Sequence, residues 1–193
     1  MKMRYEINKL KALILYILKE SGGTLDFITL FKKMYYVQQR YLVTYGKPVF
    51  SDKFKAVKLG PVPSFTYRAF CSLLDKDVQV SEEMKLFNLA FQVVESNHVR
   101  TVSMKEEPDM DELAVAEVKV IDQVLNETKG MSPKDLSNKS HEDKAWKKAR
   151  RRAEDDPTDN YMPLVNIARA GGANKQVLEH IRLTQSFDSF CKL

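Results

Sequence analysis

The side chains that most often carry out chemistry are few in this chain and lie far apart in its sequence. Three histidines (His98, His141 and His180) and two cysteines (Cys71 and Cys191) are spread over 193 residues. No two of them have the close spacing that zinc ligands show, so we interpret the histidines as structural or surface residues. The sequence therefore predicts no metal site and gives no reason to expect a cofactor.

Sequence motifs of catalysis are also missing. The chain has no Gly-x-Ser-x-Gly elbow, no P-loop and no Gly-x-Gly-x-x-Gly fingerprint. The acidic run Asp-Met-Asp-Glu at 109–112 stands where a helix is expected to begin, and acids there interact favourably with the helix dipole. We therefore prefer a helix start to a cation site, and we predict that the protein is not an enzyme.

One basic run offers a candidate contact for nucleic acid. The net charge is +5, and its densest positive cluster consists of Lys147, Lys148, Arg150, Arg151 and Arg152. Three acids at 154–156 follow directly, so a solvated helix face explains the run better than a phosphate-binding surface does. A nucleic-acid-binding regulator of phage or mobile-element origin remains the alternative function, with DNA as an uncertain partner.

Composition and the N-terminal sequence indicate the compartment. Hydrophobic residues make up 44% of the chain and charged residues 30%, which is typical of globular proteins. The apolar run at 10–18 is too short to span a bilayer, and we see no secretory signal. With only two cysteines, we expect a cytoplasmic protein that does not contact a membrane.

A stretch rich in glycine and proline, 46–67, stands between two helical patterns. Gly46 can adopt a positive φ and end the first of these helices. Pro48 then opens a β-rich arm over 48–59, and Gly60-Pro61 is a turn signal. Pro63 suits the first position of the next helix, because a helix needs no N–H donor there. We expect these five residues to serve geometry.

The remaining chain reads as helices with one hairpin. Apolar spacing of three and four predicts helices over 4–20, about 24–44, 63–74 and 111–128. Further helices are expected to begin at Ser132-Pro133, at Ser140 and at Met162-Pro163, and a C-terminal helix covers 174–190. Residues 78–90 are ambiguous, whereas 91–95 and 99–104 predict a β hairpin. The fold class is mainly α (α+β), as one compact domain over 1–193.

The second of these helices is expected to have an inner and an outer face. Phe27, Phe31 and Met34 fall on the inner stripe, and Lys32, Gln39 and Arg40 fall outside it. Tyr35 and Tyr36 are neighbours and point to different sides, so we expect exposed tyrosine beside arginine, a combination that protein interfaces favour. Tyr67, in the following helix, is assigned to its inner face.

Two separated segments carry a resemblance to a known family. The first, at 30–67, contains Lys-Lys-Met-Tyr-Tyr-Val (32–37), Tyr-Gly-Lys-Pro-Val-Phe-Ser-Asp (45–52), Phe-Lys-Ala (54–56) and Gly-Pro-Val-Pro (60–63). The second, at 132–149, contains Leu-Ser-Asn-Lys-Ser-His-Glu-Asp-Lys-Ala-Trp (136–146). Their content and order resemble the Panacea domain of the SocA-like, phage-associated antitoxins. The similarity covers roughly 10–170.

The resemblance implies a non-enzymatic antitoxin in a toxin–antitoxin system. Such a protein binds a toxin encoded in the adjacent gene and blocks it, or in the SocA-like case delivers it to a protease. Members pair with toxins of several unrelated classes, so the resemblance does not identify the toxin. Because we recognise no helix-turn-helix, it gives no support for autoregulation through DNA.

We assign the partner-binding surface to the β arm, the outer face of the second helix and the second segment. The residues chosen are Tyr36, Arg40, Asp52, Lys58, Tyr67, His141 and Trp146. An alternative stays open at this point: Asp52 and Gly60 shape the turn, and the others are ordinary surface residues. A tryptophan in this position is also typically half-buried, with its N–H on a neighbouring carbonyl.

Overall fold

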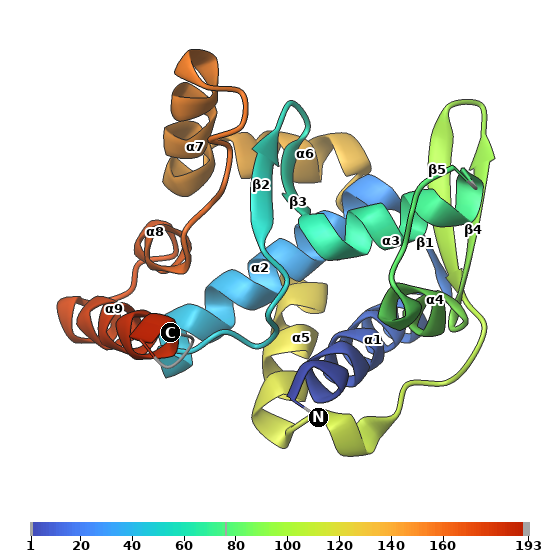
Figure 1. The fold of residues 1–193 in the computed structure, drawn as a ribbon, viewed down its shortest axis with the longest axis horizontal. Helices are drawn as coiled ribbons and strands as arrows, with labels where there is room; N and C mark the ends of the chain where they lie inside the picture. The colour runs from blue at the N-terminus through green and yellow to red at the C-terminus, as the bar shows by residue number, and fades with distance from the viewer. Residues whose placement is uncertain (1, 76, 191–193) are drawn as a thin grey trace.

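One long helix, α2 (Phe27–Tyr45), runs through the middle of the molecule, and the other elements surround it (Figure 1). The computed structural model describes residues 2–75 and 77–190, and it gives side-chain positions for 6–75 and 77–186. Cys191 lies outside the described residues. Every side chain from Thr29 to Gln39 is buried, so α2 has no outer face over these three turns.

Both ends of α2 are fixed by its local sequence. At the start, the Asp26 carboxylate accepts from the backbone N–H of Thr29 at 2.9 Å and from its hydroxyl at 2.6 Å. At the end, Gly46 adopts a φ of 66° and donates its N–H to the carbonyl of Leu42. The predicted helix stop at Gly46 is therefore confirmed.

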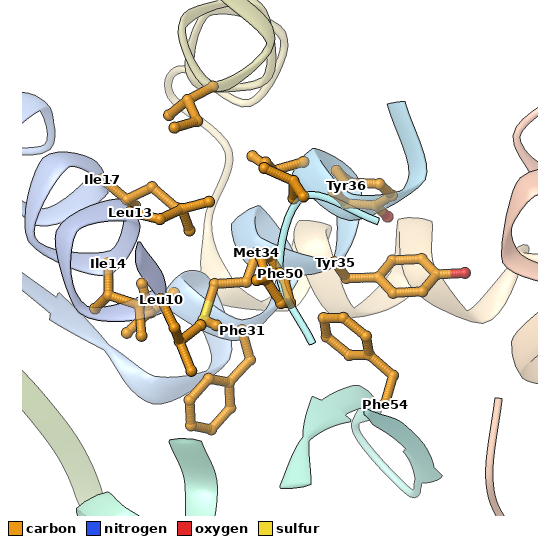
Figure 2. Packing of buried hydrophobic residues seen from close by; sticks show 14 of the residues in the cluster. Leu10, Leu13, Ile14, Ile17, Phe31, Met34, Tyr35, Tyr36, Phe50 and Phe54 are labelled. Carbon is orange, nitrogen blue, oxygen red and sulfur yellow. The ribbon is translucent and has the colours of Figure 1, made fainter. Parts of the chain in front are cut away.

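The core forms where α1 (Lys2–Glu20) and α5 (Val115–Glu127) pack on α2. Figure 2 shows Leu13 and Ile17 of α1 directed toward the α2 side chains, among them Met34. Farther along α2, the ring of Tyr35 meets the edge of Phe54 at 5.3 Å between centroids. The core thus extends along the whole buried part of α2.

A three-stranded antiparallel sheet stands at one end of the molecule, in the order β1-β5-β4. The predicted hairpin is confirmed as β4 (Phe91–Ser96) and β5 (Val99–Met104). Asn97 and His98 form its turn, and their φ values of 49° and 63° are those of a type I′ turn. Strand β1 (Thr24–Asp26) was not predicted, because three residues are too few to show an alternating pattern.

The predicted arm over 48–59 is a second hairpin with different bounds. Strand β2 (Phe54–Val57) pairs with β3 (Gly60–Pro63), and Lys58-Leu59 is the two-residue turn between them. The prediction of a turn at Gly60-Pro61 was therefore wrong, since both residues lie in β3. Residues 160–162 cover the free edge of β2: Ala56 donates its N–H to Asn160, and Met162 donates to Phe54.

The other helices lie close to where the sequence predicts them. They are α3 (Ser64–Leu74), α4 (Glu82–Asn88), the 3-10 turn η1 (Met110–Glu112), α6 (Pro133–His141), α7 (Lys144–Asp155), α8 (Leu164–Ala170) and α9 (Lys175–Phe190). Two starts were misplaced. The helix predicted from 111 begins at Val115, and the acidic run forms η1 instead. Ser140 lies inside α6, fully buried, and it is Asp143 that caps α7 by accepting from the N–H groups of Ala145 and Trp146. None of the described helices is long and apolar enough to cross a membrane.

Candidate functional site: a fixed hairpin and the groove beside it

The β2–β3 hairpin is held by side chains from three helices, each bound to one of its backbone carbonyls. The indole Nε1 of Trp146, on α7, donates to Val57 at 3.1 Å. The Ser137 hydroxyl, on α6, donates to Leu59 at 3.2 Å. The ammonium of Lys32, on α2, donates to Pro61 at 3.0 Å. Alternate carbonyls on both sides of the turn are thus bound, and the hairpin is fixed relative to the helices.

Gly60 allows these helices to approach the hairpin closely. Its φ is 103°, a conformation that other residues rarely adopt. A Cβ built at this position lies 2.3 Å from the Ser140 hydroxyl and 2.5 Å from Cε of Lys32. Only a residue without a side chain fits here, so the predicted geometric role of Gly60 has a packing reason as well as a backbone one.

Lys32 is the most unusual charged residue of this region. Its side chain is 1% exposed, and burial lowers its pKa to about 8, which the nearby carboxylate of Asp26 partly opposes. Within the described residues, no carboxylate forms an ion pair with it, and Pro61 is its hydrogen-bond partner. Its prediction as an outer-face residue was wrong, because β3 and α6 cover that side of α2.

A groove of about 770 Å³ opens beside the hairpin. It lies between the start of α2, the β2–β3 hairpin, α3 and the tip of the β4–β5 hairpin, and both hairpins rise on the same side of the molecule in Figure 1. Apolar side chains supply most of its walls: Phe27, Phe31, Val57, Leu59, Val62, Tyr67 and Val99. We call this feature the inter-hairpin groove.

The charges around the inter-hairpin groove are mostly positive. Its basic residues are Lys32, Lys55, Lys58, Arg68, His98 and Arg100. Asp26 is the acid among its lining residues, and its carboxylate is engaged as the cap of α2. Arg100 forms an ion pair at 2.8 Å with Glu95, which does not line the groove. The groove therefore joins apolar walls to a basic surrounding.

Two of the predicted site residues meet at this groove. Lys58 is exposed in the β2–β3 turn, and Tyr67 is 42% exposed on α3. Assigning Tyr67 to the inner face of its helix was wrong, but its choice as a surface residue agrees with this exposure. Leu59 and Val99, each 51% exposed, line the same groove and were not selected from the sequence.

Asp52 is buried, so the expectation that it lies on an exposed surface was wrong. Its carboxylate accepts from the N–H of Phe65 at 2.8 Å, and from the N–H and hydroxyl of Thr66 at 2.9 and 2.8 Å. Burial raises the pKa of this carboxyl, and these hydrogen bonds oppose the rise. Asp52 thus caps α3, where Pro63 occupies the N-cap position and has no side-chain acceptor. Of the two interpretations of Asp52, partner contact or shaping of the turn, its hydrogen bonds fit the second.

Tyr36 is also buried, at 5% exposure, so the expected exposed tyrosine is not found at this position. The Lys139 ammonium lies over its ring at 4.9 Å from the centroid, and Tyr35 packs against its edge. Burial raises the pKa of the Tyr36 hydroxyl, and the charge of Asp143 adds to this rise. Gln39, another residue predicted on the outer face, is buried and donates to Asp143 at 2.7 Å.

The three remaining predicted contacts lie outside the groove. Arg40 is half-buried and forms an ion pair with Glu127 on α5 at 3.0 Å. The rings of His141 and Trp146 stack at 4.3 Å with an interplanar angle of 21°. Trp146 is half-buried with its N–H on a carbonyl, which confirms that expectation. Trp146 thus binds the hairpin without lining the groove.

The basic run on α7 is divided by internal pairing. Lys147 pairs with Glu142 at 2.8 Å. Arg152 pairs with Asp159 at 2.9 Å and also donates to the carbonyl of Tyr161. Arg150 is half-buried, and Lys148 and Arg151 are exposed members of the run that form no ion pair within the part of the chain that the structure describes. No group of three or more metal-ligating side chains comes together among the described residues.

The hairpin and the side chains that hold it lie within one known protein family domain. A family model described as "Antitoxin SocA-like, Panacea domain" matches residues 30–147. The chain belongs to this family. The match includes all three donors that hold the hairpin, Lys32, Ser137 and Trp146, together with the hairpin itself. No curated protein and no solved structure matches the chain.

The Panacea match thus corresponds to a structural unit that fixes the β2–β3 hairpin. It ends at 147, so most of the basic run lies beyond it. Lys32 and Ser137 were not predicted from the sequence as residues that hold the hairpin. A signal for Lys32 was present: apolar and aromatic residues fall on every face of 30–37, which indicates a helix buried all round.

Proposed function

We propose that this protein is an antitoxin that neutralises a cognate toxin by direct protein–protein contact, and that the inter-hairpin groove with the Lys58-Leu59 turn is the contact surface. Family membership supports the antitoxin role. The observation that carries the surface is the convergence of Leu59, Tyr67 and Val99, three large exposed apolar side chains from three different elements, at one groove.

Exposed apolar side chains that gather at one concave place favour a binding surface over ordinary scatter. Buried anchors in such places supply most of the binding free energy of protein complexes. The hairpin that carries Leu59 is already fixed by three side-chain hydrogen bonds, so little conformational entropy is lost on binding. A fixed hairpin beside an apolar groove therefore suits recognition of a folded partner.

The test of this function is co-expression with the product of the adjacent gene. We expect that product to arrest growth when expressed alone and to be harmless when expressed with this protein. Because we propose direct blocking, the toxin should remain at the same level on an immunoblot in the rescued cells. A toxin that disappears would indicate delivery to a protease instead, and a neighbour that is harmless alone would contradict the antitoxin function.

A further inference from the structure

We propose that the inter-hairpin groove binds a segment of the toxin in which an Asp or Glu side chain is flanked by apolar residues, and that this carboxylate pairs with the ammonium of Lys32. The proposal deepens the proposed function and rests on it. It names the chemistry of the segment that the groove would recognise.

The hydrogen bonding of Lys32 leaves capacity for a ligand. A lysine ammonium carries three N–H donors. In the described part of the chain, one acceptor for them is found, the carbonyl of Pro61 at 3.0 Å. Lys32 lines the groove, but at 1% exposure its ammonium is covered in the unbound protein, so an acceptor must displace part of that cover and lose its own water to reach it. A charged acceptor compensates best for that desolvation.

The charges that face the ammonium favour an anionic group. From β1 it faces Asp26, which is engaged with Thr29. The other titratable groups lining the groove are basic or neutral: Lys55 and Lys58 of the hairpin, Tyr67 and Arg68 of α3, and His98 and Arg100 of the β4–β5 hairpin. From α6 the nearby side chain is Ser140, which does not titrate. Among the described residues that face Lys32, Asp26 is therefore the one acid.

The apolar walls select the kind of anion. Lys55, Lys58 and Arg68 are exposed cations that line the groove, and they attract anions of any kind. The buried cation, Lys32, shares the groove with the apolar side chains of Phe31, Leu59 and Tyr67, which a sugar-phosphate backbone does not match. A single carboxylate between apolar side chains matches both features. Exposed segments of this composition occur at the surfaces of folded proteins. The exposed Lys58 at the rim of the groove adds attraction for further acidic side chains.

Lys33 provides a matched control next to Lys32. It is also buried, at 7% exposure, and burial lowers its pKa as well. Its ammonium donates to the Thr128 hydroxyl at 3.0 Å, on the α5 side of α2, and it does not line the inter-hairpin groove. Lys33→Met and Lys32→Met therefore remove the same kind of charge from the same helix, but only the second removes it from the groove.

The experiment is a calorimetric titration of the full chain with the purified product of the adjacent gene. We expect Lys32→Met to weaken binding by about tenfold to a hundredfold, the range for a lost hydrogen bond between charged groups. Lys33→Met should bind like the wild type. Lys32→Met removes a poorly compensated buried charge and also the hydrogen bond to the Pro61 carbonyl, two effects of opposite sign, so we expect it to melt within a few degrees of the wild type at neutral pH.

The pH dependence gives a second readout. A bound carboxylate favours the charged form of Lys32, so its pKa rises on binding. Since the pKa of free Lys32 is about 8, affinity should be highest below about pH 8 and fall by up to about tenfold for each pH unit above it. This dependence should be missing from Lys32→Met and present in Lys33→Met.

The outcomes separate the two proposals. If the wild type neither binds nor neutralises the neighbour's product, the antitoxin function fails and the Lys32 pairing fails with it. If the wild type binds while Lys32→Met and Lys33→Met bind equally well at every pH, the pairing is overturned and the antitoxin function stands. If only Lys32→Met loses affinity, short overlapping peptides of the toxin should locate the segment. Each peptide is made in two forms, one with its natural Asp and Glu and one with Asn and Gln in their places. Equal binding of the two peptide series would also contradict the proposal.

Discussion

Gly60 is the residue at which α2, α6 and the β2–β3 hairpin come closest together. Its backbone has a φ of 103°, and its α-carbon faces both the Ser140 hydroxyl and the Lys32 side chain. These neighbours are themselves buried and cannot move freely. The position therefore combines backbone strain and steric overlap for any other residue.

We predict that Gly60→Ala lowers the free energy of unfolding by about 3 kcal/mol, from strained φ together with overpacking. Gly172→Ala is the control, because Gly172 has a φ of 93° but no atom within 4 Å of its Cβ position. That variant should lose only about 1 kcal/mol. Urea unfolding of both proteins measures the difference, and equal losses would show that close packing at Gly60 is unimportant.

At the same scale, Lys32 and Asp52 show how a buried charge can have different roles. The Asp52 carboxylate accepts three hydrogen bonds at the start of α3 and is fully explained by capping. Lys32 donates to one carbonyl and forms no ion pair among the described residues, so the free-energy cost of burying its charge is poorly compensated. A charge that costs stability and lines a groove is a candidate for function.

At the scale of elements, the β2–β3 hairpin owes its position to side chains that lie far from it in sequence. Trp146 approaches it from α7, on the side away from the groove residues, and stacks on His141. Its contribution to recognition is therefore indirect: it positions the hairpin whose turn, Lys58-Leu59, would contact the toxin.

We predict that Trp146→Phe, which keeps an aromatic ring but loses the N–H to Val57, lowers the free energy of unfolding by about 1 kcal/mol. The loss should be local. Amide hydrogen exchange should become faster at Lys58, Leu59 and Gly60, while the amides of the β4–β5 hairpin keep their wild-type rates. Unchanged exchange at the β2–β3 turn would contradict the role given to Trp146.

The elements themselves could largely be predicted from sequence, because caps and turns are local. Gly46 ends α2 as expected, Asn174 starts α9 by accepting from Val177, and the β4–β5 hairpin has nearly the predicted bounds. The β2–β3 hairpin was misread because Gly60-Pro61 is a turn signal by composition. Its actual turn, Lys58-Leu59, carries no glycine or proline.

At the scale of the whole molecule, the enclosure of α2 is what the sequence did not reveal. An amphipathic reading places Lys32 and Gln39 outside, but β3, α6 and α8 all pack on α2 and cover that side. Tyr36 was selected for the binding surface by the same reasoning and is buried for the same reason. The groove residues Lys58 and Tyr67 were found, whereas Leu59 and Val99 depend on how the two hairpins come together in three dimensions.

The central claim is that the toxin binds at the inter-hairpin groove, and Leu59→Asp tests it most directly. Leu183→Asp on α9 is the matched control, because Leu183 is 55% exposed, Leu59 is 51% exposed, and Leu183 lies outside the family match. We predict that Leu59→Asp weakens binding of the purified toxin by at least about a hundredfold, as for a lost apolar anchor, and that Leu183→Asp binds like the wild type. Wild-type affinity in Leu59→Asp would contradict the claim.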